Sequence, residues 1–262
     1  MHLDLTDRVV VVTGAARGIG ATIAARFHAE GCRVVALDLA FDEPAAADRP
    51  TTDESTGAPI DRVRCNVADP ASVRSAVATV VARHGTIDVL VNNAGINVDG
   101  TVAELQWDAW RRCMDVNVGG TFLMSQAVAP VMQAAGRGRI INAASFAAIV
   151  PSVGSAAYAA SKAAVVSFTR VLASELGPWD ITVNAYAPGM VPTAMNGFAT
   201  MPAEAQDRLL DTLSLRRWEA PDDVADLLVF VASDAAGYIT GTLLDVSGGK
   251  LATQIPARAH GR

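Results

Sequence analysis

The chain has 262 residues, of which 51% are hydrophobic and 18% are charged, and its formal net charge is −6. A large apolar core is therefore possible, and the negative charge argues against nucleic acid or an anionic membrane as a main partner. No apolar run reaches the roughly 18 residues of a membrane span. The N-terminal stretch MHLDLTDR lacks the basic and apolar regions of a signal peptide, so we expect no membrane partner.

The cysteines and histidines predict neither disulfides nor a metal site. No CxxC motif occurs, and the four histidines form no ligand cluster with the three cysteines Cys32, Cys65 and Cys113. Widely spaced cysteines of this kind are typical of a cytoplasmic protein with free thiols. We therefore expect a cytoplasmic protein without bound metal.

Strand and helix patterns alternate along the whole chain. Apolar, β-branched runs predict strands over 8–14, 32–39, 62–67, 86–95, 138–145, 180–189 and 241–249. Helices are expected over about 18–30, 70–84, 107–135, 155–177 and 221–233. Residues 41–60 are polar and rich in proline, which indicates an irregular connection, and residues 190–220 indicate a lid with a short helix. The alternation favours an α/β fold with a doubly wound parallel sheet, in one domain over residues 1–262.

Three glycines, Gly14, Gly18 and Gly20, follow the first predicted strand and open the first helix. Glycine allows a tight turn and close approach of the backbone to a pyrophosphate, and the helix N-terminus offers free N–H groups. Turns are rich in glycine, so the triplet alone is weak evidence of a phosphate site. The strand before it and the helix after it make a dinucleotide site the favoured interpretation.

The second predicted strand ends at Asp38, where an acidic residue can accept from the ribose hydroxyls of an adenosine. A carboxylate there repels a 2′-phosphate, which favours NAD over NADP. Arg17 in the glycine loop points the other way, because a basic side chain could hold that phosphate. We weigh Asp38 more heavily and expect NAD.

The stretch YAASK places Tyr158 four residues before Lys162. Almost every basic residue in the chain is Arg, and Lys162 and Lys250 are the two lysines. Residues i and i+4 share a helix face, and a nearby cation favours the phenolate over the phenol. Chance placement of one lysine remains the simpler reading of this stretch taken alone.

Six motifs in order make the chain resemble the short-chain dehydrogenase/reductase family over about residues 5–249. They are TGxxxGxG at 13–20, NNAG at 92–95, Asn117, Ser145, YAASK at 158–162 and PGMVPT at 188–193. The resemblance implies a Rossmann-type fold of about seven parallel strands, a nicotinamide cofactor and a homotetramer. The Ala- and Val-rich helices over 107–135 and 155–177 suit subunit packing, although burial in the core would explain them too.

The resemblance also implies roles for four catalytic residues. Tyr158 would be the general acid and base, and Lys162 would lower its pKa and hold the hydroxyls of the nicotinamide ribose. Ser145 would hydrogen-bond the substrate oxygen and the developing alkoxide. Asn117 would complete a proton relay through water to Lys162, although helix strain or a local backbone bond is the alternative for this residue.

The remaining predicted contacts divide between cofactor and substrate. The implied cofactor-binding residues are Gly14, Arg17, Gly18, Ile19, Gly20, Asp38, Asn66, Val67, Asn93, Ala94, Gly95, Tyr158, Lys162, Pro188, Gly189, Val191 and Thr193. The expected substrate contacts are Ser145, Ala147, Val150, Ser155, Tyr158, Gly189 and Met195. Position 66 departs from the Asp of many family members. The substrate set is largely apolar and lacks Arg and Lys, which argues against a strongly anionic substrate.

These observations favour an NAD-dependent oxidoreductase that acts on a small neutral secondary alcohol, polyol or ketone. An NADPH-dependent 3-oxoacyl-thioester reductase and a steroid dehydrogenase are the alternatives among enzymes. The first usually has basic residues after the second strand, where this chain is acidic, and the second suits an apolar lid. A cofactor-sensing regulator on the same fold is the alternative outside enzymes, but such proteins typically lose the Tyr or the Lys.

Overall fold

The computed structural model describes residues 3–41, 51–52, 59–193, 196–250 and 252–261. One eight-stranded sheet runs through the molecule in the order β3-β4-β2-β1-β5-β6-β7-β8. Seven strands are parallel, and the two-residue β3 pairs antiparallel with β4 at the edge. Strands β2 to β4 lie on one side of β1, and strands β5 to β8 lie on the other. This is the arrangement of a Rossmann-type, doubly wound sheet, and it confirms the predicted α/β fold class.

The central strands are buried on both faces, which explains their nearly continuous apolar sequences. Along β1, alternate residues face opposite layers, so Val10 and Val12 pack in one cluster while Val9 and Val11 pack in the other. The strands are β1 (Val9–Thr13), β2 (Arg33–Asp38), β3 (Thr51–Thr52), β4 (Pro59–Arg64), β5 (Val89–Asn92), β6 (Gly138–Ala143), β7 (Ile181–Pro188) and β8 (Leu243–Val246).

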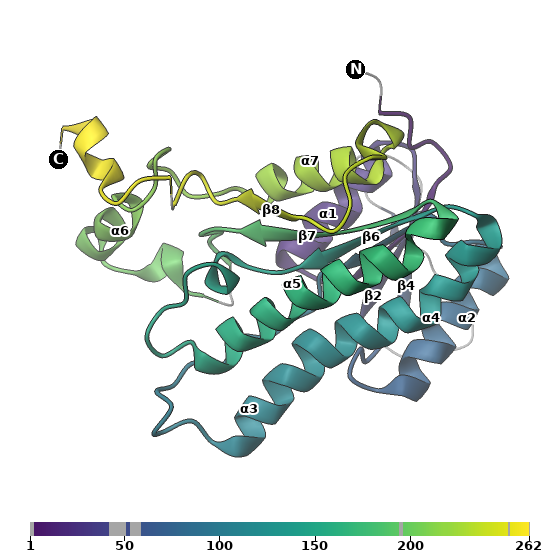
Figure 1. Cartoon of the computed structure of the whole chain (residues 1–262), viewed down its shortest axis with the longest axis horizontal. Helices are drawn as coiled ribbons and strands as arrows, with labels where there is room; N and C mark the ends of the chain where they lie inside the picture. The colour runs from purple at the N-terminus through teal and green to yellow at the C-terminus, as the bar shows by residue number, and fades with distance from the viewer. Residues whose placement is uncertain (1–2, 42–50, 53–58, 194–195, 251, 262) are drawn as a thin grey trace.

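Helices cover the sheet in two layers (Figure 1). One layer holds α1 (Gly18–Ala29) and α7 (Pro221–Ala232), and the other holds α2 (Pro70–His84), α4 (Gly120–Ala135) and α5 (Ala156–Leu176). α3 (Trp107–Met114) continues into α4 through a π-helical turn, η1 (Asp115–Gly119). The lid contains α6 (Ala203–Leu210), and the C-terminal residues lie beside it (Figure 1).

The structure departs from the sequence-based bounds in two places. The third predicted strand, over 62–67, is β4 and begins earlier, at Pro59, because its residues 61–64 pair with β2. The predicted helix over 107–135 is interrupted by η1, whose wider turn comes at Asn117. Most of the connection expected over 41–60 lies outside the described residues.

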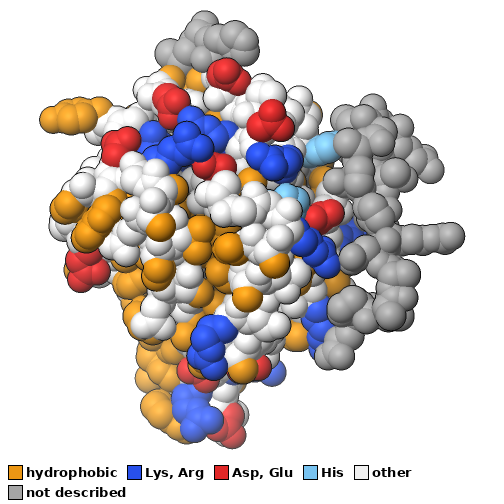
Figure 2. Space-filling model, turned by 90° about the vertical axis from the view of Figure 1, so that its right-hand side faces the viewer, with side chains coloured by type: hydrophobic (Ala, Val, Ile, Leu, Met, Phe, Trp, Pro, Cys, Tyr) orange, Lys and Arg blue, Asp and Glu red, His pale blue; other side chains and the backbone are white. Residues whose placement is uncertain are grey.

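The surface carries mixed charges. On the face in Figure 2, basic and acidic side chains are interspersed, and hydrophobic side chains gather in the lower part of the view. In the described part of the chain, no helix is long and apolar enough to cross a membrane. All three cysteines are buried and unpaired.

Candidate active site

The predicted site residues gather where the parallel strands end. Gly14 follows β1, Asp38 ends β2, Asn93 follows β5, Ser145 follows β6 and Gly189 follows β7. The carboxyl edge of a doubly wound sheet is where such folds bind ligands. The fold therefore brings together segments that lie up to about 175 residues apart in the sequence.

The glycine loop is held by Asn93 and Thr13. The Asn93 side-chain nitrogen donates to the carbonyls of Thr13 at 3.0 Å and Gly14 at 3.2 Å, and its oxygen accepts from the Tyr186 hydroxyl at 3.2 Å. The Thr13 hydroxyl accepts from the N–H groups of Asn93 and Ala94, each at 3.0 Å. Asn93, predicted as a cofactor ligand, thus uses its side chain to fix the loop.

The loop leaves room for a ligand at Gly18. This residue has φ +59°, and a Cβ built on it would meet no atom within 4 Å. A Cβ on Gly20, by contrast, would lie 2.2 Å from the Gly14 carbonyl oxygen, so that position needs glycine for internal packing. Arg17 precedes α1 without capping it, and its side chain is exposed. Ile19 lies behind it, partly buried against the core.

Asp38 faces this loop. Its carboxylate accepts from the N–H of Ala16 at 2.9 Å and from the N–H of Ala40 at 2.9 Å. These two bonds fix the orientation of the carboxylate while the residue stays partly exposed. A carboxylate has about four acceptor positions, so it can also accept from ribose hydroxyls.

Asn66 and Val67 follow β4 on the other side of the loop. The Asn66 side-chain oxygen accepts from the Ala68 N–H at 3.1 Å, and Val67 is buried against α4. A Cβ on Gly120 would lie 2.8 Å from Val67, so α4 approaches this segment closely. The Asn66 oxygen therefore has one acceptor position left for the cofactor.

Tyr158 and Ser145 meet at the end of β6. Ser145 is buried, and its side-chain oxygen accepts from the Ala147 N–H at 3.1 Å. Burial raises the pKa of Tyr158, and a hydrogen bond with Ser145 opposes that rise. In the chain by itself loss of hydration thus dominates the Tyr158 pKa, and the expected lowering by Lys162 stays a prediction.

Lys162 lies beneath this pair. Its ammonium donates to the Ala143 carbonyl at 2.7 Å and lies 5.7 Å from the centroid of the Tyr158 ring. Burial lowers the pKa of Lys162 to about 8. An ammonium has three donors, so Lys162 can hold two further acceptors next to Gly95, whose Cβ would lie 3.3 Å from it.

Asn117 occupies the π-helical turn and reaches the segment after β5. Its side-chain oxygen accepts from the Ile96 N–H at 2.8 Å, and its nitrogen donates to the Ile96 carbonyl at 3.0 Å and to Ser161 at 2.9 Å. The side chain is fully buried. The side chain thus bonds the backbone of a residue 21 positions away in the sequence.

The segment after β7 is held by a glutamate that sequence reasoning missed. A side-chain oxygen of Glu219 accepts from the Gly189 N–H at 2.6 Å, and burial raises the Glu219 pKa to about 8. A Cβ on Gly189 would lie 2.8 Å from Ser247, so β7 and β8 leave no space there. Glu219 lies 30 residues after Gly189 in an unremarkable stretch, so no sequence signal pointed to it. Pro188 and Val191 flank this point, and the Thr193 N–H bonds Asn196.

The structure describes three further residues of the expected substrate set, and a fourth lies outside the described residues. Ala147 and Val150 lie in and after the short helix that follows Ser145, with Val150 exposed. The Ser155 hydroxyl donates to the Ser152 carbonyl at 2.7 Å, so this side chain serves the loop before α5. Met195 lies outside the described residues.

Lys250 is a second residue that sequence reasoning missed. Its ammonium lies 5.1 Å from the centroid of the Phe146 ring and 3.6 Å from the Met190 sulfur. These residues directly follow Ser145 and Gly189 in the sequence. The expected substrate set contains no Lys or Arg, and it did not take Lys250 into account.

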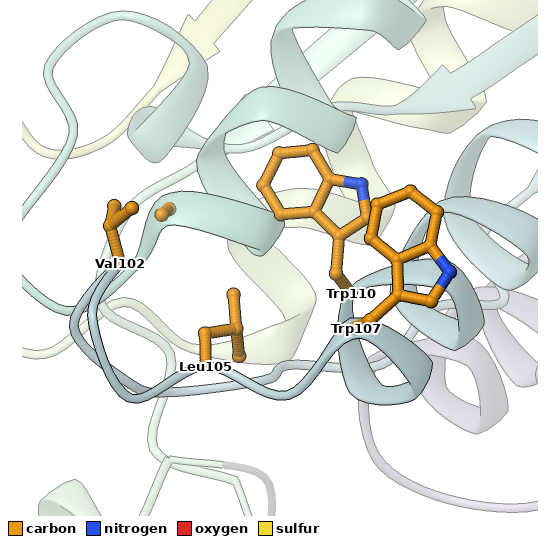
Figure 3. Close-up of a pocket in the computed structure, with 5 residues that line it drawn as sticks. Val102, Leu105, Trp107 and Trp110 are labelled. Atoms are coloured by element: carbon orange, nitrogen blue, oxygen red, sulfur yellow. The ribbon is translucent and has the colours of Figure 1, made fainter.

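An apolar pocket lies to one side of the start of α5 (Figure 3). Its lining consists of Val102, Leu105, Trp107, Trp110 and Ala156. The two indoles stand side by side on α3, and Leu105 and Val102 lie on the preceding loop. None of the predicted catalytic or substrate residues lines this pocket.

Comparison with known proteins agrees with this architecture. A family model described as enoyl-(acyl carrier protein) reductase matches residues 14–250. The chain is 36% identical over 249 residues to a 3-oxoacyl-(acyl-carrier-protein) reductase of Thermotoga maritima, spanning 94% of this chain and 99% of that protein. It is 41% identical over 246 residues to D-threitol dehydrogenase of Mycolicibacterium smegmatis, spanning 94% and 93%. The chain belongs to the short-chain dehydrogenase/reductase family.

The fold comparison points the same way. The crystal structure of gox2181 matches 96% of this chain and 98% of its own with a TM-score of 0.86, at 30% identity. The protein is therefore an NAD(P)(H)-dependent oxidoreductase of CH–OH groups. Three features fit a dinucleotide: the open space at Gly18, the spare donors of buried Lys162 and the fixed carboxylate of Asp38.

Proposed function

We propose that this protein transfers a hydride between NAD(H) and the carbinol or carbonyl carbon of a small secondary alcohol or ketone. The observation that carries the proposal is the meeting of Ser145 and Tyr158 above Lys162 at the carboxyl end of β6. The glycine loop and Asp38 lie on the same edge of the sheet. Hydride donor and proton donor can therefore approach one carbonyl group at the same edge of the sheet.

The reaction needs one hydride and one proton. The bound nicotinamide supplies the hydride and, when oxidised, a positive charge. In the reducing direction Tyr158 gives its hydroxyl proton to the carbonyl oxygen, and the Ser145 hydroxyl donates a hydrogen bond to the same oxygen. In the oxidising direction the Tyr158 phenolate removes the alcohol proton, and Ser145 steadies the alkoxide as it forms.

Lys162 sets up this proton transfer. Its burial fixes the ammonium under the Tyr158 ring, where it binds the Ala143 carbonyl. The remaining donors would hold the ribose hydroxyls of the cofactor. Burial raises the Tyr158 pKa, so formation of the phenolate depends on positive charge from Lys162 and from the oxidised cofactor together.

Asp38 supports NAD rather than NADP. Its carboxylate is held in place by two backbone N–H groups beside the glycine loop. A 2′-phosphate at this point would meet a fixed negative charge. Arg17 favours NADP instead, because its exposed side chain lies in the glycine loop and could hold the 2′-phosphate.

Fluorescence titration with NADH and NADPH tests the cofactor, followed by a rate screen over secondary alcohols, polyols and ketones. We expect NADH to bind at least about tenfold more tightly, because one fixed like charge is worth on the order of 1.4 kcal/mol. Asp38→Ser should narrow the difference in affinity between NADH and NADPH. Asp61→Ser, which replaces an aspartate on β4, should not. A preference for NADPH, or no hydride transfer with any of these substrates, would count against the proposal.

The second candidate is an NADPH-dependent 3-oxoacyl-thioester reductase. The relative from Thermotoga maritima carries that activity in its name, and Arg17 is the residue that would hold the additional phosphate. Arg17→Ala separates the two cases. If the protein is a thioester reductase, this variant should bind NADPH more weakly than the unchanged protein does. If the proposed function is correct, its affinity for NADH should be unchanged.

We also propose that the chain acts as a homotetramer. α4 and α5 carry exposed apolar residues, with Phe122 44% and Val171 57% exposed. Phe122 meets Phe168 edge to face at 6.1 Å, which makes an apolar ridge across both helices. Light scattering after size-exclusion chromatography should give four subunits, and Phe122→Asp should reduce that number.

A further inference from the structure

Lys250 carries a partly buried ammonium with neutral neighbours. It donates to the Thr212 hydroxyl at 3.0 Å and to the Met190 sulfur at 3.6 Å, and it lies over the Phe146 ring. In the described part of the chain, no carboxylate lies within ion-pair distance of it. This sets Lys250 apart from Arg216 and Arg217 in the lid, which both pair with aspartates.

The position of Lys250 connects it to the reacting centre. Phe146 directly follows Ser145, and Met190 directly follows Gly189. Lys250 itself comes after β8, from the opposite end of the sequence. Its ammonium therefore lies between the segment after β6 and the lid, next to residues that directly follow Ser145 and Gly189.

An ammonium in this position lacks a counter-ion. Burial removes part of its hydration and lowers its pKa. Thr212 occupies one of its three donors, and a thioether is only a weak acceptor. A carboxylate brought by a ligand would satisfy the remaining donor and restore charge balance.

We propose that Lys250 binds a carboxylate at the end of the substrate far from the reacting carbon, so that this enzyme acts on hydroxy acids and oxo acids. The inference rests on the proposed function and narrows its substrate class. It assigns Lys250 to specificity and leaves proton transfer to Tyr158. Of the two lysines in the chain, one then serves the cofactor and the other the substrate.

Steady-state kinetics with matched acids and esters tests this assignment. The substrates are sodium 3-hydroxybutyrate and sodium 5-hydroxyhexanoate, each beside its methyl ester, oxidised with NAD⁺. We expect kcat/KM for at least one acid to exceed that for its ester by about ten- to a hundredfold. This factor corresponds to the free energy that a hydrogen bond to a charged group contributes. Lys250→Met should abolish that ratio, mainly through KM, because a distant carboxylate binds equally in the ground and transition states.

Two variants control for charge and for the C-terminal segment. Lys250→Arg keeps the cation and should keep most of the ratio. Arg258→Met removes an exposed positive charge from the same C-terminal segment and should leave the ratio unchanged. Equal rates for acid and ester in the unchanged protein, or a ratio that survives in Lys250→Met, would overturn the assignment.

Failure of the proposed reaction is recognised separately. If neither acid nor ester is oxidised, calorimetric titration with sodium 4-oxopentanoate and its methyl ester, in the presence of NAD⁺, decides the role of Lys250. Binding of the acid alone, lost in Lys250→Met, would support the carboxylate site without the reaction. Equal binding of both compounds, or of neither, would reject the site as well.

Discussion

Asn117 clamps both backbone polar groups of Ile96 with one side-chain amide. The oxygen accepts from the Ile96 N–H at 2.8 Å, and the nitrogen donates to the Ile96 carbonyl at 3.0 Å. The π-helical turn makes this geometry possible, because the wider turn rotates Asn117 toward the end of β5. The clamp fixes Gly95, which lies next to Lys162.

Loss of this clamp should destabilise the protein. Asn117→Leu leaves the partly buried Ile96 N–H without its side-chain partner and leaves the Ile96 carbonyl with only the weak Cys113 thiol at 3.9 Å, which costs about 1–3 kcal/mol. Urea unfolding should show this loss as a lower midpoint with an unchanged slope. Asn97→Ala is the control, since the Asn97 side chain bonds only the nearby Asp99 among the described residues. Equal stability of Asn117→Leu and Asn97→Ala would contradict a structural role for the clamp.

Local motifs predicted much of this site. The glycine loop, Asp38 and the pair Tyr158 and Lys162 each lie within one strand–turn–helix unit or one helical turn, so spacing alone placed them. The fold class followed from the alternation of strands and helices, whose residue ranges the structure largely reproduces.

Contacts between distant segments could not be predicted in the same way. The clamp joins residues 21 positions apart and depends on a π-helical turn that periodicity does not reveal. Glu219 reaches Gly189 across 30 positions, and Lys250 reaches Met190 across 60. The contacts of Glu219 and Lys250 depend on how the lid folds back over the sheet edge, which is a matter of packing and not of local pattern.

Removal of the Tyr158 hydroxyl should separate chemistry from binding. Tyr158→Phe keeps the ring and its packing but loses the proton, so we expect kcat to fall by about 10²–10⁴-fold. NADH affinity should stay within about twofold, because Lys162 and the glycine loop are untouched. Tyr238→Phe, at a fully exposed position, is the control. A cofactor-sensing regulator would show no turnover to lose, so that outcome would favour the non-enzymatic alternative.

Gly18 and Gly136 form a matched pair for the phosphate site. Both have positive φ, +59° and +64°, and a Cβ on either meets no atom within 4 Å. Alanine at each position should therefore cost a similar amount, about 1 kcal/mol of unfolding free energy. Only Gly18→Ala should weaken NADH binding, because its methyl group would enter the space proposed for the pyrophosphate. Similar NADH affinities in the two variants would place the pyrophosphate elsewhere.

Glu219 should make stability depend on pH. Burial raises its folded-state pKa from 4.5 to about 8, so between these values the folded chain holds a proton that the unfolded chain has released. Stability contributed by this group therefore falls as pH rises from about 4.5 to 8, by at most about 1.4 kcal/mol per pH unit for one proton.

A neutral glutamine separates this effect from the rest of the chain. Glu219→Gln keeps an oxygen that can accept from the Gly189 N–H and removes the titration, so its stability should depend less steeply on pH over this range. Glu175→Gln, an exposed change on α5, should follow the unchanged protein. Urea unfolding at several pH values between 5.5 and 8 measures all three proteins. Parallel curves for Glu219→Gln and the unchanged protein would mean that Glu219 is already ionised in the folded state, and that its bond to Gly189 is made by a carboxylate.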